Sequence, residues 1–319
     1  MIDYTIFYRK ELPADGAWVD VPRWDIFISS FNSSERVNKV YDWVDADQKH
    51  WLMQPDYDYR PDEYPNGDVF GNTSANEAEF FQDYFDKVGV DLFDGKQICI
   101  DITGFIKPYM MHLIFCFKRM GVKKLDIIYS EPDRYAKKEE TIFSDELVYQ
   151  IRQVVGFAGI HAPDTSNDLL VIGSGYDDEL IAQVAENKNH CRKLQMFGLP
   201  SLRPDMYQEN ILNAYKASEA IGVGIRNMPS TYFAPANDPF AVATELSALV
   251  CKENERKQLS NIYLCPLATK PQALGFTLFY LTECYDMSIS MIYPFCHTHT
   301  RETSKGISRI SKYTIEFAG

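Results

Sequence analysis

The chain contains the same strand-to-helix unit twice. Residues 100–111 read IDITGFIKPYMM, and residues 264–275 read LCPLATKPQALG. In each copy an apolar strand runs into a threonine, and a Lys-Pro pair then begins an apolar helix. Proline is favoured in the first turn of a helix because its missing N–H would have no partner there. A unit that occurs twice predicts a fold built from two similar halves.

Further matches in the same order favour a tandem duplication over two unrelated α/β domains. Asp25 and Asp168 each begin an apolar run that leads through a short polar turn into an amphipathic helix, and they lie 143 residues apart. The segments YRPDEY (59–64) and LRPDMY (202–207) have the same spacing. The Lys-Pro pairs are 163 residues apart, so the second half holds about twenty extra residues, which we place around 224–240. Internal repeats of this kind define the architecture.

Strands that alternate with helices predict the fold of each half. The strands are nearly continuous apolar runs, as in parallel strands buried on both faces. Such alternation predicts right-handed crossovers and an open, doubly wound sheet. We therefore expect an α/β fold of two tandem-duplicated Rossmann-like units with mostly parallel sheets, forming a pseudo-dimer, the first over residues 1–158 and the second over 159–319. The last strand of each half follows its predecessor without a helix, so we expect it to pair antiparallel to that predecessor.

The elements expected in each half follow from this pattern. The acidic, turn-rich segment 56–80 is expected to be a surface loop. The expected strands are 25–30, 49–54, 97–103, 124–130 and 147–155, then 168–173, 192–198, 260–266, 288–294 and 309–317. The expected helices are 33–44, 75–88 and 106–119, then 176–187, 205–221, 238–251 and 270–284.

Composition limits the classes of partner and the compartment. The net charge of −13 and the pI of about 4.9 argue against a binder of duplex nucleic acid, which needs a basic face. They allow a small anion in a local pocket, because net charge is not local potential. Seven cysteines without a CxxC pair predict reduced, buried thiols. Only His297 and His299 lie at ligand spacing, so no metal is expected. No signal peptide or membrane span is indicated, which predicts a cytoplasmic protein without a membrane partner.

The turn after the first strand of each half is a candidate anion site. It reads SSFNSSE at 29–35 and GSGYDDE at 173–179. The following helix offers unpaired N–H groups and the positive end of its dipole, and glycine allows close approach of a ligand. A tight turn made of small residues is the alternative. The candidate ligand-binding residues here are Ser29, Ser30, Gly173, Ser174 and Gly175.

The Lys-Pro turn is the second candidate site. Lysine beside a helix N-terminus opposes the helix dipole, so a lysine placed there twice suggests that it serves an anion. A lysine, a hydroxyl and helix N–H groups together could hold a phosphate. A solvated loop lysine is the alternative. The candidates in this turn are Thr103, Gly104, Lys107, Thr269 and Lys270.

Acidic and basic residues near these turns complete the candidate set. Asp101 ends an apolar strand, where it either bonds the turn amides or acts as a base, and we favour the structural role. If the protein is an enzyme, Asp101 or Glu35 is the candidate catalytic acid. The loop 296–309 follows the fourth strand of the second half and carries Arg301 and Lys305, so we expect it to cover an anionic ligand there, with a solvated loop as the alternative.

The Lys-Pro unit resembles the strand-to-helix signature of CARF domains, which is often Thr-Gly-Gly-Thr-Lys before an apolar helix. Thr103, Gly104 and Lys107 match it in the first half, and Thr269 and Lys270 match it in the second. The related SAVED domain resembles two such units in one chain. The resemblance covers most of the chain in architecture. The departures are Phe105-Ile106 in place of Gly-Thr and Leu267-Ala268 in place of the glycine pair.

This resemblance implies a nucleotide-binding sensor of a prokaryotic antiviral defence system rather than an enzyme. A phosphorylated nucleotide, with a cyclic oligonucleotide among the candidates, would bind in the cleft between the halves, and a separate effector protein would respond. No other cofactor is expected, and a homo-oligomer is left open. WDIFISSFNSSERV also resembles the start of a TIR domain, so an NAD- or nucleoside-processing hydrolase or transferase is one alternative. A non-catalytic subunit of a defence complex is another.

Overall fold

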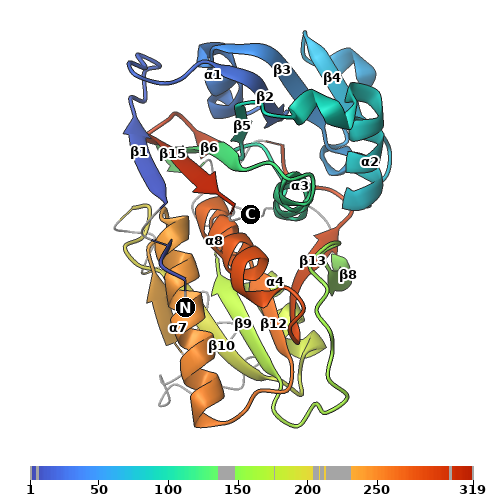
Figure 1. Ribbon diagram of the computed structural model, residues 1–319, viewed down its shortest axis with the longest axis vertical. Helices are drawn as coiled ribbons and strands as arrows, with labels where there is room; N and C mark the ends of the chain where they lie inside the picture. The colour runs from blue at the N-terminus through green and yellow to red at the C-terminus, as the bar shows by residue number, and fades with distance from the viewer. Residues whose placement is uncertain are drawn as a thin grey trace. The chain divides into compact units, whose positions relative to one another are not determined.

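A computed structural model of the chain shows two compact units. It describes residues 2–4, 7–135, 148–175, 177–203, 231–301 and 304–317, together with Gln208 and Leu212. The first unit comprises Phe7–Leu147 with Cys296–Gly319, and the second comprises Met1–Ile6 with Val148–Phe295. Each unit contains one large, mostly parallel sheet with helices between its strands (Figure 1).

The first unit has a seven-stranded sheet in the order β1-β15-β6-β5-β2-β3-β4. The five strands from β6 to β4 are parallel, whereas β15 is antiparallel to β6 and β1 is antiparallel to β15. Its strands are β1 (Tyr8–Leu12), β2 (Trp24–Ser30), β3 (Ala46–Met53), β4 (Asp68–Gly71), β5 (Ile98–Asp101), β6 (Lys124–Glu131) and β15 (Arg309–Glu316), and its helices are α1 (Glu35–Trp43), α2 (Glu77–Val88) and α3 (Lys107–Arg119).

The second unit has a six-stranded sheet in the order β11-β10-β9-β12-β13-β8. The pairs from β11 to β13 are parallel. Its strands are β8 (Val148–Gln153), β9 (Leu169–Ser174), β10 (Arg192–Gly198), β11 (Thr231–Ala234), β12 (Ile262–Pro266) and β13 (Ile289–Cys296), and its helices are α4 (Asp178–Asn187), α7 (Pro239–Arg256) and α8 (Lys270–Phe279), which continues as a π-helical turn over Tyr280–Cys284.

The two sheets share the same order of six strands, and β1 is an additional edge strand of the first sheet. Counted along the chain from β2 or from β9, each sheet reads 3-2-1-4-5 and then a last strand, which is the order of a Rossmann-like sheet. Equivalent contacts support the duplication. The Asp25 carboxylate accepts from the backbone N–H of Gln97 at 2.7 Å, just before β5. The Asp168 carboxylate accepts from the backbone N–H of Asn261 at 3.1 Å, just before β12. The predicted α/β fold of two Rossmann-like units is confirmed.

The last strands of the two halves are exchanged between the sheets. β15, from the end of the chain, pairs with β6 in the first unit, and β8 lies beside β13 in the second (Figure 1). The units therefore differ from the predicted division at 158/159. The antiparallel pairing predicted for 309–317 is present, but its partner is β6 instead of β13. Both sheet edges offer the same backbone hydrogen bonds, so a strand pattern does not tell which edge a strand joins.

Side chains explain which edge each exchanged strand joins. Lys312 of β15 donates to Asp126 of β6 at 2.9 Å, and both residues are buried. By strand register, Ser290 of β13 takes the place of Asp126, so β13 offers this lysine no carboxylate. Gln153 of β8 instead donates to the Ser290 hydroxyl at 3.2 Å. A buried cation needs a paired carboxylate, which favours β15 beside β6.

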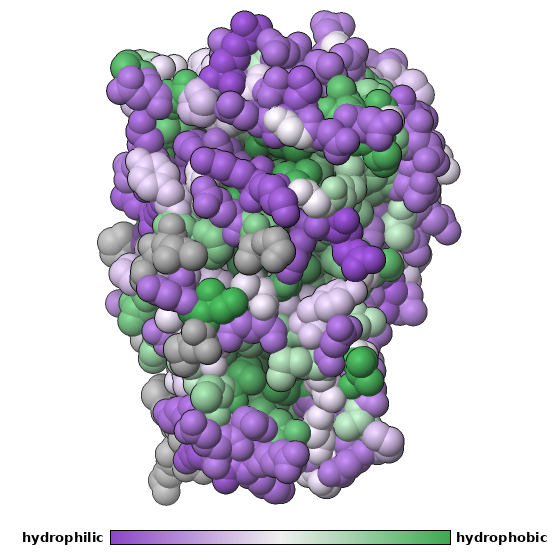
Figure 2. All heavy atoms as spheres, viewed as in Figure 1, coloured by the Kyte–Doolittle hydropathy of each residue, from purple (hydrophilic) through white to green (hydrophobic). Residues whose placement is uncertain are grey.

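Three short edge strands, β1, β4 and β11, were not expected from the sequence. The segment 56–80 is not only a surface loop, because it contains two short 3₁₀ helices and the edge strand β4 beside β3. The strands β1 and β11 are short and their alternation is too brief to predict. The helix expected at 205–221 lies largely outside the described residues. Polar side chains predominate on the face drawn in Figure 2, where apolar residues form separate patches.

Candidate functional site

The predicted ligand-binding turns lie at the two points where the strand order reverses. In Rossmann-like sheets, ligands bind outside the carboxyl ends of the strands at this switch point. It falls between β2 and β5 in the first unit and between β9 and β12 in the second. The first edge brings together Ser29, Ser30, Thr103, Gly104 and Lys107, and the second brings together Gly173, Ser174, Gly175, Thr269 and Lys270.

Several candidates of the first edge shape the turn from the interior. The Ser29 hydroxyl donates to Asp101 at 3.3 Å, and the Thr103 backbone N–H donates to the same carboxylate at 2.9 Å. The Thr103 hydroxyl oxygen accepts from the backbone N–H of Ser130 at 3.0 Å. All four residues are buried. This arrangement is the structural role that we favoured for Asp101, and it commits the Thr103 hydroxyl to β6.

Glycine is required at both edges because the two turns come into close contact. A Cβ atom on Gly104 would overlap the backbone carbonyl oxygen of Ser30, at the end of β2. In the second unit the relation is reversed. A Cβ atom on Gly175, after β9, would lie 2.6 Å from the carbonyl oxygen of Leu267, after β12. The chain therefore uses glycine on opposite sides of the two switch points to bring the same pair of strand ends together.

Unpartnered polar atoms gather at the first edge. Six buried side-chain polar atoms of the described residues have no hydrogen-bond partner, and four of these belong to the ends of β2 and β3 and to the start of α1. Buried polar groups are nearly always paired, so a group of exceptions indicates a place where a ligand or ordered water is bound. The four atoms are Ser30 Oγ, Ser34 Oγ, Arg36 Nε and Gln54 Nε2.

Arg36 is the one charged residue among these four. Its side chain donates through Nη1 to the carbonyl oxygen of Ser130 and through Nη2 to the Ser304 hydroxyl at 2.8 Å. Arg36 is only 7% exposed, and no carboxylate of the described residues forms an ion pair with it. A buried charge without a counter-ion is costly. The residue 143 positions later is Glu179, which is exposed in α4, so the buried cation is present in the first unit alone of the two repeats.

The helix and turns around Arg36 add to the positive potential. Arg36 is the second residue of α1, and the N-cap residue Ser34 makes no side-chain cap hydrogen bond. The side-chain oxygen of Gln54 accepts from the backbone N–H of Ile106 at 2.9 Å, which fixes the start of α3 beside it. Two helix N-termini thus face this edge, each with partial positive charge. The first residue of α3 is Lys107, which is half-buried.

Glu35 is at this helix start but does not have the environment of a catalytic acid. Its side chain is 48% exposed and forms an ion pair with Lys39 at 2.5 Å. The hydrogen bond from Lys39 lowers the pKa of the Glu35 carboxyl. A general acid at neutral pH needs a raised pKa, which burial would supply. Asp101 is buried, but its oxygens are used by Ser29 and Thr103.

The basic loop near the C-terminus belongs to the first unit, so the expectation that it covers the second half is wrong. Arg301 donates through Nε to the carbonyl oxygen of Tyr57 at 2.7 Å and forms an ion pair with Glu63 at 2.9 Å. Its guanidinium also lies 4.2 Å from the centre of the Tyr59 ring. Arg301 therefore anchors the loop to the acidic segment 56–80, and Lys305 is exposed in the short strand β14 (Ser304–Lys305). Because β15 pairs with β6, the loop that precedes β15 also belongs to the first unit.

The second edge is less basic. The Ser174 hydroxyl donates to Gln195 at 2.7 Å inside the sheet. Thr269 caps α8 by accepting from the Gln272 backbone N–H at 3.3 Å, and Lys270 is half-buried at the first helical position. The side-chain nitrogen of Gln272 is buried and has no hydrogen-bond partner within the described ranges. This edge resembles the first in geometry but has no buried arginine among its described residues.

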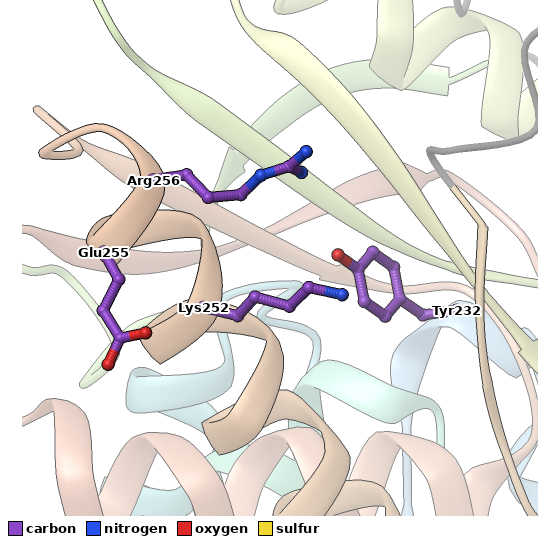
Figure 3. Close-up of a pocket in the computed structure, with 4 residues that line it drawn as sticks. All are labelled: Tyr232, Lys252, Glu255 and Arg256. Carbon is purple, nitrogen blue, oxygen red and sulfur yellow. The ribbon is translucent and has the colours of Figure 1, made fainter.

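A cavity at the end of α7 is a poorer candidate. It has a volume of 480 Å³ and is lined by Tyr232, Lys252, Glu255 and Arg256 (Figure 3). Its arginine is already neutralised, because Arg256 pairs with Glu253 at 3.3 Å. The Tyr232 hydroxyl also donates to Glu253, at 2.8 Å. The charges of this cavity thus form a surface ion network, and such networks are common without a ligand.

Residues missed by the sequence analysis are Arg36 and Gln54. The sequence does contain a signal for Arg36. It is a basic residue in the first turn of the helix after the first strand, where it opposes the helix dipole in the same way as Lys107. No sequence pattern distinguishes Gln54, which follows β3 and reaches α3 only through the fold.

The rate at which each cysteine is alkylated tests how deeply its thiol is buried. Cys251 is exposed, whereas burial raises the pKa of the Cys191 thiol to about 11 and that of the Cys116 thiol to about 12. Only the thiolate reacts, so at pH 8 we expect iodoacetamide to modify Cys251 at least about tenfold faster than either of these. Peptide mapping by mass spectrometry after timed labelling measures the rates. Equal rates for all three in the folded protein would contradict this packing.

Comparisons with known proteins leave the family open. No family model matches the chain, and no curated protein matches it. A solved ketoreductase domain from the bacillaene assembly line has 11% sequence identity and a TM-score of 0.23, over 86% of this chain and 69% of that one. A TM-score this low carries no argument about function. Among the described residues, no helix combines the length and apolarity needed to cross a membrane.

Proposed function

We propose that this protein binds a phosphorylated small molecule, a nucleotide by class, at the carboxyl edge of the first sheet. The observation that carries the proposal is the buried Arg36 guanidinium, which has no carboxylate partner among the described residues and belongs to the group of unpartnered polar atoms at a Rossmann switch point. An anion there would supply the counter-ion of this guanidinium. Phosphate oxygens suit a guanidinium because they accept two parallel N–H hydrogen bonds.

The surrounding groups supply the rest of a phosphate site. The first turns of α1 and α3 offer backbone N–H groups, and Lys107 adds a second cation at the start of α3. The hydroxyls of Ser30 and Ser34 could donate to the same ligand, since neither has a partner in the described part of the chain. These two hydroxyls take the role that the sequence suggested for Thr103, whose hydroxyl is hydrogen-bonded to Ser130 of β6.

A binding role fits this site better than catalysis. Glu35 is ion-paired and exposed, and Asp101 is held by two hydrogen bonds in the interior. More specifically, we propose that the protein is a sensor of a prokaryotic antiviral defence system. Its ligand would be a cyclic oligonucleotide, and a separate effector protein would respond to the bound state. That part rests on the resemblance of the two strand–Thr–Lys-Pro–helix units to CARF and SAVED domains.

A thermal-shift screen tests the proposal. The panel is ATP, NAD, and a linear and a cyclic oligoadenylate. A ligand at 100 times its Kd stabilises the native state by about 2.7 kcal/mol, which raises the melting temperature. We expect Lys107→Ala to weaken the active compound about tenfold, as for loss of one charged hydrogen bond. Lys270→Ala reports on the second edge in the same way.

Controls separate binding from general effects of charge and from turnover. Lys123→Ala removes an exposed lysine just before β6, at the amino edge of the same sheet, and should leave the shift unchanged. Chromatography of the active compound after incubation shows whether it is hydrolysed. No shift with any member of the panel, or equal shifts in wild type and K107A, would contradict the proposed site.

A further inference from the structure

Three potential metal ligands converge at the amino edge of the second sheet. Asp168 precedes β9, and His190 and Cys191 precede β10. Their donor atoms all lie within 4.8 Å of one another. The His190 Nε2 atom is 3.3 Å from Asp168 Oδ2 and 3.4 Å from Cys191 Sγ. This edge is opposite to the carboxyl ends of the strands and so is separate from the candidate nucleotide sites.

The contacts do not form a Cys-His-Asp catalytic relay. In such a relay one ring nitrogen faces the nucleophile and the other faces the carboxylate. Here the same nitrogen, His190 Nε2, faces both the thiol and the carboxylate. Atoms of three residues that point to one place are instead the arrangement of ligands around an ion.

The distances from His190 Nε2 to the other two donor atoms fit a tetrahedral metal centre. With metal–ligand bonds of about 2.0–2.2 Å to nitrogen and oxygen and about 2.3 Å to sulfur, a tetrahedral angle separates N from O by about 3.4 Å and N from S by about 3.6 Å. The observed separations are 3.3 and 3.4 Å. An ion could therefore enter with small movements of the three side chains.

The carboxylate is already oriented for this role. Asp168 Oδ1 accepts from the backbone N–H of Asn261 at 3.1 Å and from its side-chain amide at 2.9 Å, which leaves Oδ2 directed to His190. Outer hydrogen bonds of this kind fix the ligands of metal sites. The Asp168 carboxylate is buried, whereas the His190 side chain is 45% exposed, so solvent can reach the fourth position.

The first unit provides an internal comparison. Asp25 takes the place of Asp168. Its carboxylate accepts the equivalent backbone hydrogen bond, from Gln97 just before β5. By strand register, Ala46 and Asp47 take the places of His190 and Cys191. Asp47 pairs with Arg23 at 2.7 Å. Holding the strands together therefore needs only the aspartate, and the fold does not require the imidazole and thiol of the second unit.

We propose that Asp168, His190 and Cys191 bind a divalent transition-metal ion, Zn²⁺ by ligand type, with water in the fourth position. Thiolate and imidazole ligands favour Zn²⁺ over Mg²⁺ or Ca²⁺. Binding converts the Cys191 thiol to a thiolate and releases its proton to solvent. The sequence analysis expected no metal, because Asp168 lies 22 residues from His190 and such a gap forms no ligand-spacing motif.

Cobalt substitution of the full-length protein tests this proposal. After dialysis against a chelator, the protein is titrated with Co²⁺ and then with Zn²⁺ in competition with a chromophoric chelator. We expect one equivalent of Co²⁺ to give a thiolate-to-cobalt charge-transfer band, and Zn²⁺ to displace it. Cys191→Ser should abolish the band, and His190→Ala should weaken Zn²⁺ binding by more than the ~10–100-fold typical of losing an outer-shell partner.

The controls make each outcome decisive. Cys251→Ser removes an exposed cysteine of α7 and should leave the band and the affinity unchanged. The wild-type spectrum needs no variant to fold, so absence of a charge-transfer band at saturating Co²⁺ would overturn the proposal. A band that persists in C191S would overturn it as well. The result is independent of nucleotide binding, which the thermal-shift screen measures at other residues.

Discussion

Replacing Arg36 with methionine is expected to abolish binding of the phosphorylated ligand while leaving the free protein as stable as wild type or more so. Methionine has a similar length without the charge, so the packing of α1 against β6 is retained. Removing one partner of a buried charge pair costs about 2–5 kcal/mol of binding, or about 30-fold to several thousand-fold in Kd. The unliganded protein loses two hydrogen bonds but also an unpaired buried charge, whose removal is neutral or stabilising.

Two measurements separate these effects. Urea unfolding without ligand should give R36M a free energy of unfolding within about 1 kcal/mol of wild type, or above it. Titration with the compound found in the screen should show the loss of affinity. Arg23→Met is the matched control, because Arg23 is 62% exposed and pairs with Asp45 and Asp47 at the surface. A drop of several kcal/mol in R36M without ligand would mean that Arg36 is a structural residue.

Gly104→Ala is expected to be the most destabilising single methyl addition at the first edge. The new Cβ would overlap the Ser30 carbonyl oxygen, and a backbone atom cannot move aside as a flexible side chain can. We expect a loss of at least about 4 kcal/mol in the free energy of unfolding, in the range of severe core substitutions. Denaturant unfolding followed by circular dichroism measures it.

Gly121→Ala separates overlap from backbone strain. Gly121 has a φ of +82°, but a Cβ there would meet nothing within 4 Å. That substitution should cost only about 1–2 kcal/mol, the strain of a left-handed residue. If G104A were no more destabilising than G121A, β2 and the turn after β5 would not be in the close contact described above.

The repeated sequence predicts the sheet of each unit well but not the exchange of its last strand. Apolar runs and Lys-Pro helix starts locate β2, β5, β9 and β12, because burial on both faces imposes a continuous apolar pattern. The partner of β15 depends instead on one buried pair, Lys312 with Asp126, formed between distant parts of the chain. Strand patterns carry no information about such a contact.

The sequence predicts which turns lie at the switch point, but it predicts only part of their side-chain contacts. Threonine, glycine and lysine at the switch point are visible in the sequence, yet Thr103 turns inward to Ser130 and Arg301 is bound by Glu63. The unpaired state of Arg36 is a property of its surroundings. The burial of Arg36 and its lack of an ion pair among the described residues depend on β6 and on the segment after β13, which only the fold brings to α1.

Mass spectrometry of the small molecules released by heating purified wild type and R36M, followed by titration of both proteins with the compound found, tests the central claim most directly. The account predicts a phosphorylated compound that leaves wild type, rebinds to it and raises its melting temperature, and that neither accompanies nor stabilises R36M. Release of the same compound in equal amounts from both proteins would contradict the claim. So would wild type that releases no phosphorylated compound and is stabilised by no nucleotide of the panel.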